Sequence, residues 1–426
     1  MDASRLRVLV VATRPPFPPG GGGSVALHGL LQALWVAGVT VRVVALQASG
    51  QSVRESPYPQ RLVEAGPRSW AGVLPSLASR TPLAVARYRL SELATAVDAE
   101  IASFAPDAVH LEQLHLAWLL SQLAGSVPVV LRQQNVESLL LARFASLFAL
   151  PLRSLANLES RRTRRYERWA CESATLVAAI SEPDAASFRA LAPGARVEVL
   201  PAAIAFDPSR PQPLRGSPPF LCLGSFDWLP NRDGARWLVR EVWPKLRRLS
   251  PSGVLHIAGP GSSTLGSAHD PSIERHGRVE TAASLYDPRA VVLIPLRAGS
   301  GIRMRLLEAW AAGVPAVASP IAGEGLVTAN GDGALVASTA QEFAAAAAHL
   351  GEDPDLRRRI VESGRAKVAE HDCARVAARA RRLYLQAIEV HPASVGVVRR
   401  TGAGPDREKT GREATPPAPR RPPMRQ

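Results

Sequence analysis

The segment from Leu296 to Ser319, LRAGSGIRMRLLEAWAAGVPAVAS, contains the signals of a turn, a helix and a following strand. The residues just before it, AVVLIP, form a short apolar run that is typical of a buried strand of a parallel sheet. The turn Gly299–Gly301 follows, and the helix expected from about Ile302 is ended by Gly313. A strand, a helix and a strand in this order predict a parallel sheet covered by helices.

The same alternation of strands and helices occurs twice along the 426 residues. The first series begins with the strand RVLVVA at Arg7–Ala12 and a helix at about Ser24–Ala37, with Ser24 as its N-cap. We therefore predict an α/β protein with two Rossmann-like, doubly wound parallel-sheet domains that face a cleft. The predicted divisions are an N-terminal domain at 1–205, a proline-rich linker at 206–218, a second domain at 219–371, a C-terminal helix at 372–391 and a disordered basic tail rich in proline and arginine at 392–426.

The net charge of +14 comes almost entirely from arginine, since the chain has only three lysines. This charge suits anionic ligands, such as phosphates or an acidic membrane surface, and we expect no nucleic-acid partner. The three cysteines are isolated, which excludes a disulfide framework and favours a reducing compartment. We found no signal peptide and no 18-residue apolar run, so we expect a cytoplasmic protein, with the inner face of the membrane as a further option.

The residues around Gly299 are suited to binding a diphosphate. The turn lies at the carboxyl end of a strand, where glycines let the backbone approach a ligand and the next helix presents free N–H groups. We expect Gly299, Ser300 and Gly301 to contact phosphate, with Arg303 and Arg305 as cations. Glu308, about one turn further, is suited to two ribose hydroxyls. The alternative is an exposed Arg/Glu helix after an ordinary turn.

Other loops at strand ends are further candidates for the donor site. The stretch PPFPPGGGGS includes Gly22 and Gly23, but it is too long for a dinucleotide fingerprint and has no acidic partner on the next strand. We expect it to close over phosphate or sugar; a merely flexible loop is the alternative. In the second domain the candidates are Gly224, Ser225, Arg232 and Gly259.

Polar residues also follow two strands of the first domain. Glu112 lies in VHLEQLH, and Asn135 and Glu137 lie in RQQNVES. They are the catalytic candidates, because polar groups facing a cleft can hold sugar hydroxyls or accept a proton. The histidines and acids show no metal-ligand spacing, so we expect no metal.

The stretch 138–170 combines leucine and phenylalanine with arginines at 153, 161, 162, 164, 165 and 168. It has two interpretations. One is an amphipathic face that contacts an anionic membrane. The other, which the pattern favours, is a core-facing helix pair with a solvated basic side.

Taken together, these motifs resemble glycosyltransferase family 4, the retaining enzymes of GT-B fold, over roughly Arg7 to Ile388. The similar segments include PLRAGSGIRMRLLEAWAAGVPAVAS, LGSFDWLPNRDG, IAGPG, HGRVE, PPFPPGGGGS and LRQQNVES. Glu308 matches the second glutamate of the family's E-x7-E motif, whereas Gly301 stands at the first. A glycine-rich version of this loop is common in one branch of the family. Members of that branch often have a lysine at the position of Arg305. Glu112 stands where many members have histidine.

The resemblance implies a hexosyltransferase that moves a sugar, with retention, from a nucleotide-diphospho-sugar held by the second domain. The acceptor, held mainly by the first domain, would be a glycan, a lipid-linked molecule or a small molecule, as in polysaccharide or glycoconjugate biosynthesis. No cofactor or metal is expected. A nucleotide-sugar epimerase of the same fold is one alternative. A catalytically silent sugar-nucleotide-binding protein is the other, suggested by Gly301 at the glutamate position.

Overall fold

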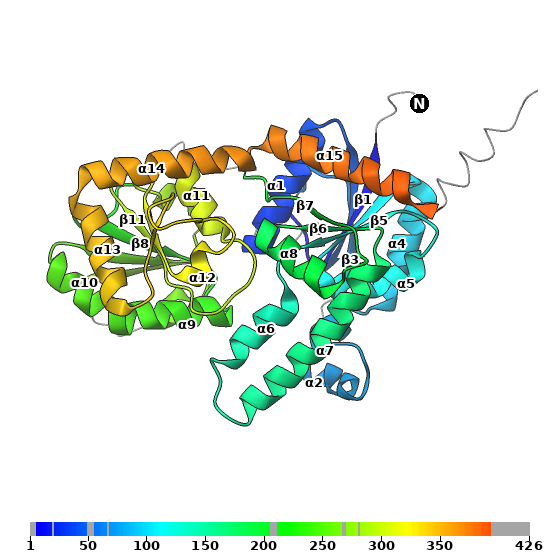
Figure 1. Ribbon diagram of the computed structural model, residues 1–426, viewed down its shortest axis with the longest axis horizontal. Helices are drawn as coiled ribbons and strands as arrows, with labels where there is room; N and C mark the ends of the chain where they lie inside the picture. Colours follow the sequence, from blue (N-terminus) through cyan, green and yellow to red (C-terminus); the bar gives the residue numbers. More distant parts are fainter. Residues whose placement is uncertain are drawn as a thin grey trace, which may run out of the picture.

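The computed structural model describes residues 6–18, 21–48, 55–65, 68–204, 211–265, 270–279 and 282–392. It has two α/β domains, each built on one parallel sheet with helices on both faces (Figure 1). The predicted fold class is confirmed. The predicted tail from 393 onward and positions 205–210 at the linker lie outside the described residues.

The first sheet has seven strands in the order β3-β2-β1-β4-β5-β6-β7. Its central strands are buried along their whole length, as expected where helices cover both faces. The strands are β1 (Arg7–Ala12), β2 (Thr40–Gln47), β3 (Gln60–Glu64), β4 (Ala108–Glu112), β5 (Val129–Gln133), β6 (Leu176–Ala179) and β7 (Val197–Val199). The helices are α1 (Gly22–Val36), α2 (Trp70–Val73), α3 (Leu83–Ala86), α4 (Ser91–Phe104), α5 (Leu120–Leu123), α6 (Glu137–Ala145), α7 (Leu152–Ser173) and α8 (Glu182–Leu191), with 3-10 turns η1 (Leu74–Ala78) and η2 (Leu114–Leu119).

The second sheet has six strands in the order β10-β9-β8-β11-β12-β13. The strands are β8 (Pro219–Leu223), β9 (Val254–Ala258), β10 (Ile273–Gly277), β11 (Val291–Ile294), β12 (Ala316–Ala318) and β13 (Leu335–Val336). The helices are α9 (Leu229–Trp237), the π-turn η3 (Leu238–Val242), α10 (Trp243–Leu249), α11 (Met304–Ala312), α12 (Pro320–Gly323), α13 (Ala340–Glu352) and α14 (Pro354–Val368), with 3-10 turns η4 (Ser262–Thr264), η5 (Ala282–Leu285) and η6 (Ala369–His371).

The last helix, α15 (Cys373–Val390), returns to the first domain and packs on α1 (Figure 1). One of its faces is buried in the core of that domain through Leu383, Tyr384 and smaller neighbours. Full burial of a single leucine stabilises a fold by about 1.5–3 kcal/mol, so this helix is an integral part of the first domain.

Two local predictions were wrong. Helix α1 begins at Gly22, with Gly21 as its N-cap three residues before the predicted cap, so Ser24 lies inside the helix. Helix α11 begins at Met304, because Gly301 has a φ of 74° and Arg303 is extended, so the chain becomes helical two residues later than expected.

The favoured interpretation of stretch 138–170 was also wrong in part. Helices α6 and α7 do pair with each other, but they project from the first domain (Figure 1). The start of α7 lies beyond the core, so its leucines at 152, 155 and 158 are exposed. Within the described residues, no helix has the length and apolar content needed to cross a membrane.

Candidate active site

The glycine turn between β11 and α11 lies against the first domain. Gly301 has a φ of 74°, and a Cβ added there would lie 2.0 Å from the carbonyl oxygen of Gln134. A side chain at this position would therefore be strained and would also clash with the segment after β5. The sequence predicted that this glycine brings the backbone close to a ligand; in the structure it brings the two domains together.

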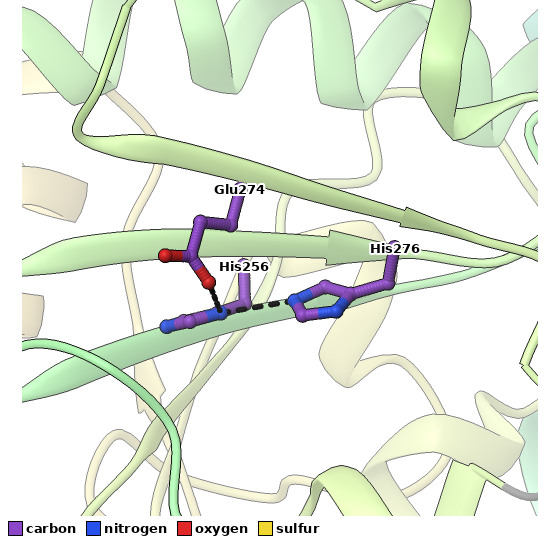
Figure 2. A group of neighbouring side chains, drawn as sticks. All are labelled: His256, Glu274 and His276. Atoms are coloured by element: carbon purple, nitrogen blue, oxygen red, sulfur yellow. Dashed lines mark hydrogen bonds and ion pairs between the residues drawn. The ribbon is translucent and has the colours of Figure 1, made fainter.

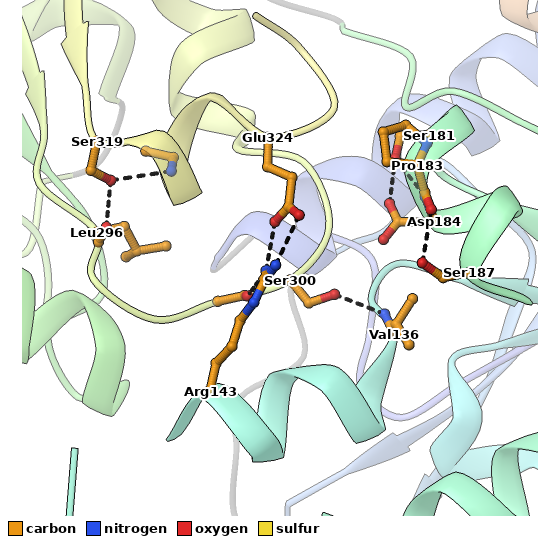
Figure 3. Close-up of polar contacts among 12 residues, drawn as sticks. Val136, Arg143, Ser181, Pro183, Asp184, Ser187, Leu296, Ser300, Ser319 and Glu324 are labelled. Carbon is orange, nitrogen blue, oxygen red and sulfur yellow. Dashed lines mark hydrogen bonds and ion pairs between the residues drawn. The ribbon is translucent and has the colours of Figure 1, made fainter. Parts of the chain in front are cut away.

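Two polar contacts hold the same turn to the first domain, and a third joins the first domain to Glu324 at the end of α12 (Figure 3). The backbone N–H of Val136 donates to Ser300 Oγ at 3.0 Å. Arg143 of α6 donates from Nη1 to the carbonyl oxygen of Gly299 at 2.6 Å, and from Nη2 to Glu324 Oε1 at 2.9 Å. The structure is thus a closed arrangement in which the predicted donor loop is fixed by acceptor-side residues.

The N-termini of α1 and α11 lie close to each other across the domain boundary. A Cβ on Gly22 would lie 3.9 Å from Met304 Cγ. Neither helix has a side-chain cap or an acidic residue in its first turn. Ser24 Oγ, in the first turn of α1, is buried and makes no hydrogen bond among the described residues. Two uncapped helix N-termini leave N–H donors and positive dipole ends at one place, which favours an anion.

Arg303, at the start of α11, carries a guanidinium group that lies against the glycine turn. Its Nη2 donates to the carbonyl oxygen of Ser300 at 2.7 Å, whereas its buried Nε has no partner among the described residues. Burial lowers the pKa of Arg303 to about 10, although Asp184 and Glu324 act in the opposite direction. A buried cation that is only partly paired gains from an anionic ligand.

Arg305 and Glu308 are engaged with each other. Arg305 Nη1 donates to Glu308 Oε2, and the hydroxyl of Tyr286 donates to the same oxygen at 2.8 Å. Burial lowers the pKa of Arg305, but Glu308 and Tyr286 outweigh it and raise the pKa above its usual value. The structure therefore does not place Arg305 as a second free cation. The hydrogen bonds of Glu308 among the described residues all use Oε2, which leaves Oε1 for a ligand hydroxyl.

The loops after β8 and β9 are braced against each other. A Cβ on Gly259 would lie 1.9 Å from the carbonyl oxygen of Gly224, so glycine is required by this close backbone contact. Ser225 accepts a bond from Asn231 Nδ2 at 3.0 Å through its carbonyl oxygen. Arg232 Nε donates to the carbonyl oxygen of Phe226 at 2.8 Å. Arg232, predicted as a phosphate ligand, thus holds the shape of the loop.

Glu112 is at the centre of a buried polar network. Its Oε1 accepts from Arg132 Nη1 at 3.1 Å and from Gln134 Nε2 at 2.5 Å, and its Oε2 lies 2.7 Å from His110 Nε2. The other ring nitrogen of His110 lies 2.7 Å from the hydroxyl of Tyr384, on α15. Burial raises the pKa of Glu112, but Arg132 and His110 outweigh it and lower the pKa overall. An ionised carboxylate with both oxygens occupied is suited to positioning its neighbours.

Gln113 and Gln134 are site residues that the sequence reasoning missed. The Nε2 of Gln134 donates to the carbonyl oxygen of Gly23 at 3.1 Å, and Gln113 Nε2 donates to Gln134 Oε1 at 3.4 Å. Gln113 has φ 75° and ψ 156°, a conformation that costs a non-glycine residue about 1–3 kcal/mol and that clusters at functional sites. Each glutamine follows the end of a strand, and this position was the only sequence feature that could have identified them as site residues.

Asn135 lies at the domain boundary, and Glu137 is its neighbour within the first domain. Asn135 Nδ2 donates to Glu137 Oε1 at 3.2 Å. A Cβ on Gly301 would lie 2.8 Å from Asn135 Oδ1, so this amide faces the glycine turn. Glu112 instead lies behind Gln134, in the interior of the first domain, where it contacts Arg132 and His110 on the strands.

Metal-binding groups are found in one place among the described residues (Figure 2). His256 Nδ1 lies 3.0 Å from His276 Nε2 and 3.3 Å from Glu274 Oε2. The other ring nitrogen of His256 lies 2.8 Å from the carbonyl oxygen of Arg215, and Arg215 Nε pairs with Glu274 at 3.0 Å. The group lies on β9 and β10, and two strands separate the edge strand β10 from β11, where the glycine turn begins.

Comparison with known proteins agrees with this geometry. The model of the glycosyl transferases of group 1 matches residues 217–353, and that of the glycosyl transferase 4-like domain matches residues 21–203. No curated protein matches the chain significantly.

Solved structures with a similar fold cover almost the whole chain. Sucrose-phosphate synthase from Thermosynechococcus elongatus superposes with a TM-score of 0.68 at 17% identity, over 90% of this chain and 99% of that one. Anabaena HepE in complex with UDP-glucose gives a TM-score of 0.58 at 13% identity, over 87% of this chain and 97% of that one. A glycosyltransferase from Rickettsia africae gives a TM-score of 0.61 at 13% identity, over 91% of this chain and 99% of that one.

Two parallel-sheet domains that contact each other through the glycine turn, together with these similar structures, define a protein of GT-B fold. Since one glycosyltransferase family model matches each domain, the chain belongs to the GT-B glycosyltransferases of the group 1 and 4-like kind.

Proposed function

We propose that this chain transfers a sugar from a nucleotide-diphospho-sugar to an acceptor hydroxyl, with retention at the anomeric carbon. The observation that supports this most is the meeting of two uncapped helix N-termini with the partly unpaired Arg303. A diphosphate would satisfy these groups together. Glu308 Oε1 would accept from the ribose. The similar HepE structure holds UDP-glucose, which supports a donor of this class.

The reaction breaks the bond between the anomeric carbon and the diphosphate oxygen, and the electron pair leaves with the nucleoside diphosphate. The acceptor oxygen forms its bond to the same carbon on the same face, and its proton passes to the departing phosphate oxygen. Arg303 and the N–H groups at the start of α11 stabilise the charge that develops on this phosphate. These groups supply the positive charge that a metal ion would otherwise provide, so we propose that no metal is needed.

Asn135 would hold the acceptor, since it faces the glycine turn from the first domain, and Glu137 would act beside it through its contact with Asn135. Glu112 would act as a positioning residue, because it fixes Gln134 against Gly23. Closure by Arg143 excludes water from the donor. The acceptor class remains a glycan, a lipid-linked molecule or a small molecule of polysaccharide or glycoconjugate biosynthesis in the cytoplasm.

The proposal is tested by incubating the protein with a panel of labelled sugar nucleotides and acceptors. We expect a glycosylated product and an equal amount of nucleoside diphosphate, with a product anomeric coupling constant that matches the donor. Conversion of one sugar nucleotide into another without product would indicate an epimerase and overturn the proposal. Binding without turnover would indicate a silent binding protein, and an inverted product would overturn the assigned stereochemistry.

A further inference from the structure

Exposed apolar side chains are concentrated at one end of the first domain. Twelve large hydrophobic side chains are exposed among the described residues, and four of them are the leucines at 150, 152, 155 and 158, at the beginning of α7. Their exposed fractions lie between 47% and 76%. Three more, Trp70, Leu74 and Leu77, lie in the α2–η1 segment. More than half of the exposed apolar residues therefore come from two short segments.

These two segments lie against each other. Arg162 of α7 donates from Nη2 to the carbonyl oxygens of Ser76 and Ser79 at 2.7 and 2.9 Å, which fixes η1 against the helix. Leu158 and Leu155 precede Arg162 by about one and two helical turns and so share its side of α7. Figure 1 shows α2 beside α7 where the helix pair projects from the domain. We call these seven residues the apolar tip.

The exposed charge on the first three quarters of α7 has one sign. The exposed charged residues of α7 between 152 and 168 are arginines, at 153, 161, 164, 165 and 168. The acids in this range, Glu159 and Glu167, are buried. Glu159 pairs with Arg162, and Glu167 accepts hydrogen bonds from Ser138 and from the N–H of Glu137. The surface therefore presents cations and apolar groups together, with no exposed carboxylate along this part of the helix.

We propose that the apolar tip is the surface by which this protein binds a membrane that contains anionic lipids. A continuous apolar patch marks an interaction surface, and flanking arginines attract the negative headgroup region. Leucine and tryptophan are suited to the depth of the headgroup boundary, where an amphipathic helix lies in the plane of the interface. The contact is peripheral, since no described helix is long and apolar enough to cross the bilayer.

This surface is connected to the predicted acceptor side of the cleft. Helix α6, which pairs with α7, begins at Glu137 and contains Arg143, which contacts the carbonyl oxygen of Gly299. A membrane bound at the apolar tip would bring a lipid-linked acceptor to the same domain. The binding itself does not rest on the proposed transfer reaction.

The test is flotation of the full chain with vesicles of phosphatidylcholine alone or with 30% phosphatidylglycerol. We expect binding to the anionic vesicles that falls about tenfold in the double variant Leu155→Ser/Leu158→Ser. The matched control is Leu249→Ser/Leu385→Ser, which changes two exposed leucines on α10 and α15 and should bind like the unchanged protein. The arginine-rich tail is present in all of them, so only the tip residues differ.

Equal binding by the two double variants would overturn the proposal. A dimer that is seen by light scattering and lost in Leu155→Ser/Leu158→Ser would also overturn it, because the tip would then bind a second copy. Release of nucleoside diphosphate in the absence of vesicles should be the same in both variants, so failure of the transfer reaction is distinguishable from failure of membrane binding.

Discussion

Replacing Gly301 with alanine should disable the closed site while leaving the second domain folded. A Cβ at this position would lie 2.0 Å from the carbonyl oxygen of Gln134 and 2.8 Å from Asn135 Oδ1, and both atoms belong to the other domain. Real Cβ contacts do not approach so closely, so the domains must separate by about 1 Å or more to accommodate the methyl group. Overpacking of this kind costs about 1–3 kcal/mol.

The backbone strain of the same substitution is a separate effect. Gly301 has a φ of 74°, and an alanine there costs about 1–2 kcal/mol within the second domain alone. Gly331→Ala is the matched control, because Gly331 has a φ of 91° and a Cβ there would meet nothing closer than Ile360 Cδ1 at 4.0 Å. Both variants should lower the melting temperature by a similar amount.

Only Gly301→Ala should lose the closed state. A cost of 1–3 kcal/mol at the domain boundary corresponds to a fall of about 5- to 150-fold in kcat/KM for the sugar donor. The assay is nucleoside diphosphate release at fixed acceptor, with donor-induced closure followed by small-angle X-ray scattering. If Gly301→Ala retained kcat/KM within twofold of Gly331→Ala, the assignment of this glycine to domain closure would be refuted.

Four further substitutions test the site. Arg303→Gln should weaken the binding of a nucleoside diphosphate at least tenfold, as measured by calorimetry. The control is Arg297→Gln, because Arg297 lies on the same loop but pairs with Asp233 at the surface; this variant should bind like the unchanged protein. Equal affinities of the two variants would remove Arg303 from the site. Glu308→Gln should weaken nucleoside diphosphate binding but leave inhibition by pyrophosphate unchanged, and a parallel loss of both would contradict its assignment to the ribose. Burial raises the pKa of Glu167 from 4.5 to about 7, so up to about 3 kcal/mol of stability should be lost as the pH rises from 4.5 to 7. Glu167→Gln should flatten this decline in the free energy of unfolding, as measured with urea. An unchanged dependence on pH would contradict the burial argument.

The sequence predicted the elements of the fold because their signals are local. The strand at Arg7–Ala12 was placed to the residue, since an apolar run between polar neighbours is sufficient to define a buried strand. The position of the glycine turn after β11 was likewise correct. The N-cap of α1 was misplaced by three residues: Ser24 is a good cap by type, but the cap is Gly21, and glycine is also accepted at that position.

The candidate site depended on contacts between distant residues, which no local pattern encodes. His110 and Tyr384 are 274 residues apart, yet they join in the network that positions Gln134 behind the cleft. The pairing of Arg305 with Glu308 depends on Tyr286 from another segment.

The exposed tip of α7 illustrates the same limit. The combination of leucine with arginine indicated an amphipathic helix, and α7 is one. It did not indicate whether anything covers that face, because covering requires the position of α7 relative to the rest of the first domain. The structure leaves the leucines at the beginning of the helix beyond the core, whereas Ala170 and Cys171 near its end are buried.

The central claim is that two helix N-termini, the glycine turn and Arg303 bind the diphosphate of a sugar nucleotide. The most direct measurement is a crystal structure of the full chain with a nucleoside diphosphate. The account predicts phosphate oxygens within hydrogen-bond distance of Arg303 and of the N–H groups around Ser300, with a ribose hydroxyl on Glu308 Oε1. A nucleotide bound elsewhere, or an Arg303 that makes no contact with it, would contradict the account.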